Sequence, residues 1–278
     1  MLTLLFYERE TEQAATLDDL ATALATLPDL TWEAPTGARY QPVRWRDPIT
    51  GARANWDLGT PPLEEDDEPP RTYSGWRVLP LSLSVPLVGP HWHAVAALAQ
   101  VDRLLEAAPY LTPLDTEDVH ATPESEAGPF TWSRARAITN WNALRGIQAE
   151  GLTLPRLDRA SSVALWRYRV QRSAGRQAHP GFHWPEALAL HDLHDGSVRT
   201  ACLWTDPTEP LALPPVDLVA MRGGCIPADE LRLLADASAV HGGAQLLSPS
   251  PTVEAFFRGA KPLPVARFNG LGDEDWMD

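Results

Sequence analysis

Residues 75–107, GWRVLPLSLSVPLVGPHWHAVAALAQVDRLLEA, combine the clearest strand pattern and the clearest helix pattern in the chain. Between positions 81 and 87, leucine and valine alternate with serine and proline, which predicts a strand with one apolar face. Gly89 and Pro90 end this alternation. Apolar residues then recur at helical spacing, at Val95, Leu98, Val101 and Leu105. We therefore expect a strand followed directly by a helix.

The segments before residue 75 add a strand, a helix and several short strands to this pair. Thr16 and Asp19 have the spacing of a capping box, which predicts the start of a helix. Short strands are expected at 30–33, 40–46 and 53–58, separated by turn-forming residues. The order resembles a split βαβ, ferredoxin-like arrangement with an inserted hairpin.

The C-terminal half also mixes helices and strands, so the predicted fold class is α+β with two mixed α/β halves. Asp195-Gly196 between two apolar runs is a strong hairpin signal. Residues 163–170 are a strand candidate, and 216–247 suggest a strand, helix, strand crossover. The loop-like stretch before residue 133 separates an N-terminal domain, 1–130, from a C-terminal domain, 131–278, that ends in an acidic tail.

Charge and cysteine content limit the classes of function. The 278 residues include 23 basic and 37 acidic side chains, a formal net charge of -14, which disfavours binding to nucleic acid. Two cysteines cannot form a disulfide framework, and the apolar run after Met1 stops at Glu8, too early for a membrane span. We expect a cytoplasmic, bacterial-type protein that does not bind a membrane.

Lys261 is the only lysine of the chain. A phosphate-binding loop, a protein kinase and a pyridoxal enzyme each need a lysine in a defined context, and the sequence GAKPLP provides none of them. We therefore expect no cofactor.

Four residues of the sequence LDTEDVH form the leading candidate for a metal site: Asp115, Glu117, Asp118 and His120. Carboxylates and imidazole suit a divalent cation or acid–base chemistry, but the spacing matches no specific motif, and a solvated acidic loop is the alternative. His91 and His93 are less suitable, because residues two apart on a helix point about 200° away from each other.

Gly223, Gly224 and Cys225 lie between a predicted strand and a helix expected to begin near Pro227. Backbone amides at such a junction can hold an anion or lower the pKa of a thiol. A buried cysteine that acts as a small apolar side chain is the alternative.

Tryptophan and arginine alternate in the short strands of the first half, where the candidates for an interaction face are Trp32, Arg44, Trp45, Arg46 and Trp56. Both residue types anchor protein interfaces. The same pattern also fits half-buried sheet residues flanked by arginines.

The sequence therefore favours a non-catalytic protein-binding protein, an accessory subunit or a neutraliser of a basic partner. The alternative is a metal-dependent hydrolase or another enzyme that uses the acidic loop 115–120.

Overall fold

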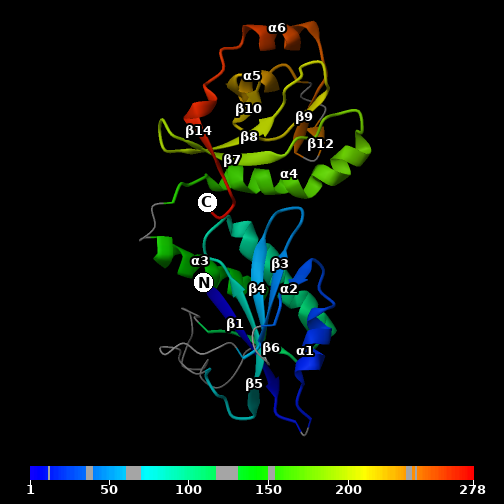
Figure 1. The fold of residues 1–278 in the computed structure, drawn as a ribbon, viewed down its shortest axis with the longest axis vertical. Helices are drawn as coiled ribbons and strands as arrows, with labels where there is room; N and C mark the ends of the chain where they lie inside the picture. Colours follow the sequence, from blue (N-terminus) through cyan, green and yellow to red (C-terminus); the bar gives the residue numbers. More distant parts are fainter. Residues whose placement is uncertain are drawn as a thin grey trace. The chain divides into compact units, whose positions relative to one another are not determined.

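The structure is a computed structural model with two compact units (Figure 1). The first unit consists of Met1–Leu87 and His91–Leu152, and the second of Val88–Pro90 and Thr153–Asp278. The structure describes residues 1–11, 13–35, 40–60, 70–116, 131–149, 154–235, 240–241 and 243–278. Helices and several sheets together confirm the α+β class. The division falls at residue 152 rather than 130, so the helix at 134–149 belongs to the first unit.

Within its described residues, the first unit contains one six-stranded antiparallel sheet and three helices. In chain order the elements are β1 (Leu2–Arg9), α1 (Leu17–Leu24), β2 (Leu30–Trp32), β3 (Tyr40–Arg46), β4 (Arg53–Gly59), β5 (Trp76–Val85), α2 (His91–Ala107), β6 (Thr112–Asp115) and α3 (Arg134–Ala149). The strand order is β2-β3-β4-β5-β1-β6. Strand β5 lies between β1 and β4 and is antiparallel to both. The ferredoxin-like assignment of this unit stays a prediction.

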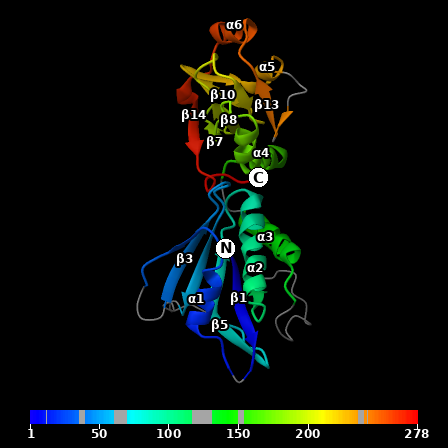
Figure 2. The ribbon, with the colours of Figure 1, turned by 90° about the vertical axis from the view of Figure 1, so that its right-hand side faces the viewer.

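The strand and helix expected from residues 75–107 are confirmed as β5 and α2. From Leu79 to Val85 every second residue of β5 is buried, and Leu83 lies opposite both Leu4 and Trp56 in the sheet register. Helices α1 and α2 contact β4 and each other, and α3 contacts α2. Figure 2 shows α2 and α3 on one side of the sheet. The core of the unit thus lies between the sheet and its helices.

In its described residues, the second unit contains two smaller sheets, three α-helices and one 3-10 helix. In chain order the elements are α4 (Arg159–Ala178), β7 (Ala187–Asp192), β8 (Val198–Leu203), β9 (Leu211–Leu213), β10 (Leu218–Met221), β11 (Gly224–Pro227), α5 (Ala228–Arg232), β12 (Val240–His241), β13 (Ala244–Leu247), α6 (Pro251–Gly259), the 3-10 helix η2 (Val265–Arg267) and β14 (Phe268–Leu271). The sheets have the orders β11-β10-β8-β7-β14 and β12-β13-β9. Among the paired strands of the described residues, β8 and β10 are parallel and the other pairs are antiparallel.

The predicted hairpin at Asp195-Gly196 is confirmed: it joins β7 to β8, and Gly196 has the positive φ, 73°, that this turn requires. The strand predicted at 163–170 is wrong, because these residues lie within α4. Asp158 caps this helix by accepting a hydrogen bond from the Ser161 amide at 2.9 Å. Its buried residues Leu165 and Tyr168 are three positions apart, a helical spacing.

Two further expectations for the second unit are wrong. The strand, helix, strand crossover does not form, because β13 pairs with β9 in the separate three-stranded sheet. The predicted acidic tail is folded: β14 pairs with β7, and the Trp276 side chain is fully buried. Burial of a large aromatic ring offsets the cost of ordering a polar segment.

No helix in the described ranges is both long enough and apolar enough to span a membrane.

Candidate functional site

A groove of about 780 Å³ lies in the first unit between α1 and the segment that joins α2 to β6. The end of β1, the chain leading into α1 and one side of α1 form the rest of its wall; these elements are labelled in Figure 1. Five of the lining residues are alanines: Ala14, Ala15, Ala23, Ala107 and Ala108. Small side chains leave the groove open, and its polar chemistry comes from a few larger residues.

Asp19 is placed at the groove by the start of α1. The Asp19 carboxylate accepts hydrogen bonds from the Thr16 amide at 2.9 Å and the Thr16 hydroxyl at 2.7 Å. The Thr16 hydroxyl oxygen accepts from the Asp19 amide at 3.2 Å, which confirms the predicted capping box. These bonds hold the pKa of Asp19 below its ordinary value, so this carboxylate is ionised at neutral pH.

Glu8, at the end of β1, is the second carboxylate of the groove. Only 5% of the residue is exposed. It accepts hydrogen bonds from Arg77 Nη1 at 3.0 Å and from the Ala15 amide at 3.1 and 3.3 Å. Glu8 therefore fixes the chain that enters α1, and the guanidinium of Arg77 balances its charge.

Tyr110 lies on the α2–β6 side of the groove and is substantially exposed. Partial burial raises the pKa of its hydroxyl, and the negative charges of Asp19 and Glu8 raise it further. Both carboxylates therefore act on the same hydroxyl group. The guanidinium of Arg9, the one basic side chain among the described residues of the lining, lies 4.5 Å from the centre of the Trp76 ring.

Two carboxylates and one aromatic ring suit a cationic side chain. Arginine and lysine donate charge-assisted hydrogen bonds to carboxylates and also stack on aromatic rings.

The structure separates the five residues predicted for an interaction face. Trp45 and Trp56 are 2% and 0% exposed and belong to the core, which corrects their assignment to an exposed face. They alternate with outward-facing residues on β3 and β4, so the sheet directs them towards the helices. Arg44 and Arg46 are exposed, and Trp32 is partly exposed on the edge strand β2.

Of the predicted metal ligands, the structure describes Asp115 alone; Glu117, Asp118 and His120 lie outside the described residues. The Asp115 carboxylate, at the end of β6, accepts a hydrogen bond from Asn140 Nδ2 of α3 at 2.6 Å. Within the described ranges, no three His, Cys, Asp or Glu side chains form a group that could hold a metal ion. The metal hypothesis for this loop stays a prediction.

The segment Gly223, Gly224 and Cys225 does not lie at a strand–helix junction, which corrects the sequence-based expectation. It belongs to the β10–β11 hairpin, and α5 begins only at Ala228. Cys225 is buried, and its backbone exchanges two hydrogen bonds with Leu263, at 2.8 and 2.9 Å. Burial raises the pKa of its thiol, so Cys225 has the character of a small core residue rather than of a nucleophile.

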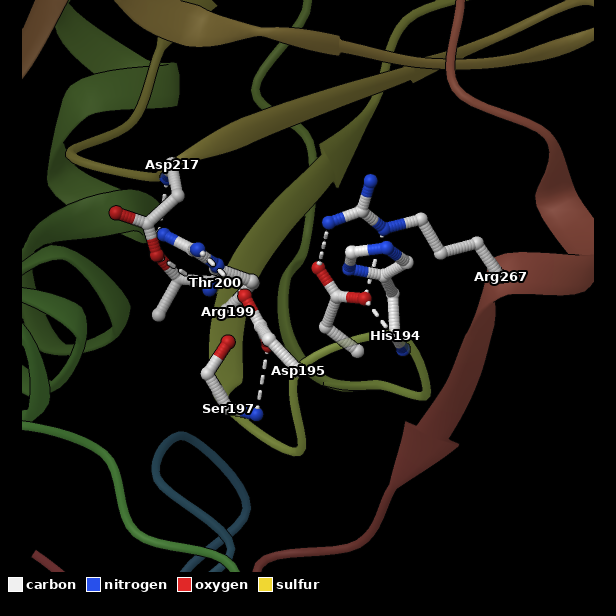
Figure 3. Close-up of polar contacts among 8 residues, drawn as sticks. His194, Asp195, Ser197, Arg199, Thr200, Asp217 and Arg267 are labelled. Carbon is white, nitrogen blue, oxygen red and sulfur yellow. Dashed lines mark hydrogen bonds and ion pairs between the residues drawn. The ribbon is translucent and has the colours of Figure 1, made fainter.

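Polar residues cluster around the β7–β8 hairpin of the second unit (Figure 3). The Thr200 amide and hydroxyl donate hydrogen bonds to the Asp217 carboxylate at 2.7 and 3.0 Å. The Asp217 amide donates to the Thr200 hydroxyl oxygen. Arg199 pairs with Asp195 at 3.2 Å within the hairpin. Each of these side chains has a partner within the cluster, so the cluster stabilises the hairpin.

Sequence patterns did not identify the groove. The capping box indicates where Asp19 lies, but nothing in the sequence indicates that Glu8 and Tyr110, about a hundred positions apart, lie near it. Comparison of the chain with protein-family models, curated proteins and solved structures finds no significant match.

Proposed function

We propose that the chain is a non-catalytic, cytoplasmic protein-binding protein, an accessory subunit or a neutraliser of a basic partner, and that a basic segment of this partner binds in the groove. The observation that supports the proposal is the combination of Glu8, Asp19 and the Tyr110 ring within one open groove. The partner's arginine or lysine would contact the exposed Asp19 carboxylate while its aliphatic stem packs against the alanines.

Charge around the groove supports the same kind of partner. Three exposed carboxylates, Glu10, Asp18 and Glu106, are direct sequence neighbours of lining residues. The formal net charge of -14 adds a long-range attraction for cations. Such fields raise the rate of association more than they raise the final affinity.

The size of the groove fits a short segment. A volume of about 780 Å³ lies within the roughly 300–1,000 Å³ typical of ligand pockets. One or two side chains fill such a space, and the surrounding acidic surface would contact the residues on either side of them.

The first test introduces a positive charge into the groove. Thr22 is exposed and lines the groove on α1, so Thr22→Arg both fills the space and opposes a cationic ligand. Ala25→Arg is the matched control, because Ala25 is exposed at the end of the same helix and is not part of the lining. We expect Thr22→Arg to weaken binding of a fluorescent hexa-arginine peptide by about tenfold, and Ala25→Arg to have much less effect.

A second test separates the tyrosine ring from its hydroxyl. If the ring stacks on the cation, Tyr110→Phe should keep most of the affinity and Tyr110→Ala should lose several-fold. Equal binding by the Thr22 and Ala25 variants would exclude the groove as the site. A chain that also purifies from native extracts without a partner at any salt concentration would contradict the proposed function as a whole.

A further inference from the structure

We infer that the outer side of helix α4 docks an acidic, amphipathic helix of a partner protein. The docking surface, which we call the arginine–valine stripe, consists of Arg159, Val163, Arg167, Val170 and Ala174. It lies in the second unit and recognises the opposite charge from the groove, so the inference goes beyond the proposed function.

The stripe follows from the helical repeat of α4. Its five members are three or four positions apart, so their side chains lie along one side of the helix. Four of them are exposed, and Val163 is half-buried. The buried residues Leu165 and Tyr168 lie on the other side of the helix and belong to the core of the second unit. The stripe therefore faces away from that core.

The charge of α4 differs from that of the chain as a whole. The helix contains five arginines and no acidic residue, within a chain whose formal net charge is -14. Arg169 and Arg172 form ion pairs with carboxylates of their own unit. The side chains of Arg159 and Arg167 form no hydrogen bond or ion pair with any residue that the structure describes. Both charges of the stripe are therefore available to another molecule.

The composition of the stripe is not the one that helix stability alone favours. A glutamate four positions from an arginine stabilises an exposed helix, yet α4 contains no such pair. Val163 and Val170 are β-branched and have a lower helix propensity than alanine, leucine or arginine. Val170 is nevertheless 44% exposed in the middle of the helix. Contact with another molecule explains these choices better than contact with water.

Charge and spacing together favour an amphipathic helix as the occupant. Arg159 and Arg167 are eight positions apart, about 12 Å along the helix axis. Carboxylates two turns apart on a partner helix have nearly the same spacing and bind guanidinium groups through charge-assisted hydrogen bonds. Leucines between those carboxylates would pack against Val163 and Val170. The small side chain of Ala174 lets the partner's backbone approach closely.

A nucleic acid fits the stripe less well. Its affinity depends on neutralising several phosphates, whereas the stripe offers two arginines with a valine between them. A long polyanion would also extend into the field of an acidic chain. An acidic helix with its own apolar side chains uses both the arginines and the valines.

The test uses the full chain and a fluorescein-labelled peptide of glutamate, alanine and leucine, whose leucines have helical spacing. Binding is followed by fluorescence anisotropy at low salt. We expect Arg159→Glu/Arg167→Glu to weaken binding by about tenfold or more. Arg222→Glu/Arg258→Glu is the matched control, because both residues are exposed, lie outside the stripe and change the net charge equally. It should leave the affinity within about threefold.

Two further variants separate the apolar contact and the folding of the helix from the charge. Val170→Ser should weaken binding several-fold, because it removes apolar contact and keeps the charge of the stripe. The milder Arg159→Gln/Arg167→Gln should also weaken binding. Thermal unfolding measured in parallel should show the same midpoint as the unmodified chain, since both arginines are exposed.

Four results would overturn the inference: unchanged binding by the arginine variants, an equal loss in the control, unchanged binding by Val170→Ser, or tighter, arginine-dependent binding of a single-stranded hexanucleotide. The last would identify a nucleic-acid surface instead. The arginine variants should bind hexa-arginine at least as well as the unmodified chain does, so failure of this inference and failure of the groove are distinguishable.

Discussion

The Asp192 carboxylate accepts two hydrogen bonds from the Arg267 guanidinium, at 2.7 Å from Nε and 2.6 Å from Nη2, although 75 positions separate the residues. Only 1% of Asp192 is exposed. The Leu193 amide also donates to the Arg267 carbonyl at 2.9 Å. The pair joins the β7–β8 hairpin to the chain just before β14, so it closes one edge of the five-stranded sheet.

Loss of this pair should destabilise the second unit. Asp192→Ala leaves the Arg267 guanidinium without its carboxylate partner and removes the bonds that hold the hairpin to the segment before β14. We expect a loss of about 3 kcal/mol in the free energy of unfolding. Arg199→Ala removes the exposed pair with Asp195 and should leave the urea midpoint nearly unchanged. Equal midpoints for the two variants, measured by urea unfolding, would contradict the importance of the buried pair.

Because of this pair, the stability of the second unit should depend on pH in the acid range. Hydrogen bonds from Arg267 lower the pKa of Asp192 in the folded chain, whereas an unfolded aspartate has a pKa of about 3.9. The contribution of the Asp192–Arg267 pair to stability is therefore complete above about pH 4. It is lost as the pH falls through the pKa of Asp192 in the folded chain. We expect the difference in stability between the unmodified chain and Asp192→Asn to shrink from pH 6 to pH 2. A constant difference in unfolding experiments across that range would exclude this linkage.

Gly224 should tolerate no side chain. Its φ is +157°, and an added Cβ would overlap the carbonyl oxygen of Leu263. Gly224→Ala should cost well over 1 kcal/mol, whereas Gly223→Ala, which also has a positive φ but open space, should cost about 1 kcal/mol. Urea unfolding of the two variants compares these costs, and a smaller loss at Gly224 would mean that the 262–263 backbone moves freely.

The two cysteines should react only when the second unit opens. Burial raises the pKa of Cys202 to about 12 and also raises that of Cys225. Ellman's reagent at pH 8 should therefore modify both thiols slowly in the native chain and rapidly in urea. Gly224→Ala should speed the reaction of Cys225, because the added Cβ would displace Leu263, which packs against the cluster that contains Cys225. Rapid modification of the native unmodified chain would restore Cys225 as a candidate nucleophile.

Two tryptophans of the first unit should differ strongly in their effect on stability. Trp56→Ala removes a fully buried ring and should cost about 3–5 kcal/mol. Trp32→Ala, at a partly exposed position on the edge strand, should cost much less. Thermal unfolding gives the comparison. Similar losses would place Trp32 in the core as well.

Local sequence patterns predicted the local structure well. The capping box of α1, the strand and helix at 75–107 and the Asp195-Gly196 hairpin each depend on residues within a few positions of one another. The backbone responds to these signals directly, through capping, periodicity and the positive φ of glycine.

Features that join distant residues were not predictable from one sequence. The Asp192–Arg267 pair, the pairing of β13 with β9 and the groove formed by Glu8 and Tyr110 all depend on long-range folding. The error at 163–170 has a different cause. Over a short window, its apolar residues fit both the two-residue period of a strand and the 3.6-residue period of a helix. The N-cap at Asp158 favours the helix.

The segment Val88–Pro90 belongs to the second unit, where Gly89 and Arg156 each form a backbone bridge with Met277. Next to Met277, the Trp276 ring completes the core of that unit. During synthesis on the ribosome, this core must therefore stay open until residue 277 has emerged, although residues 88–90 left the exit tunnel long before. The described strands of the first unit end by residue 115. A pause or premature stop before residue 276 would leave the first unit able to fold and the second exposed to proteases and chaperones.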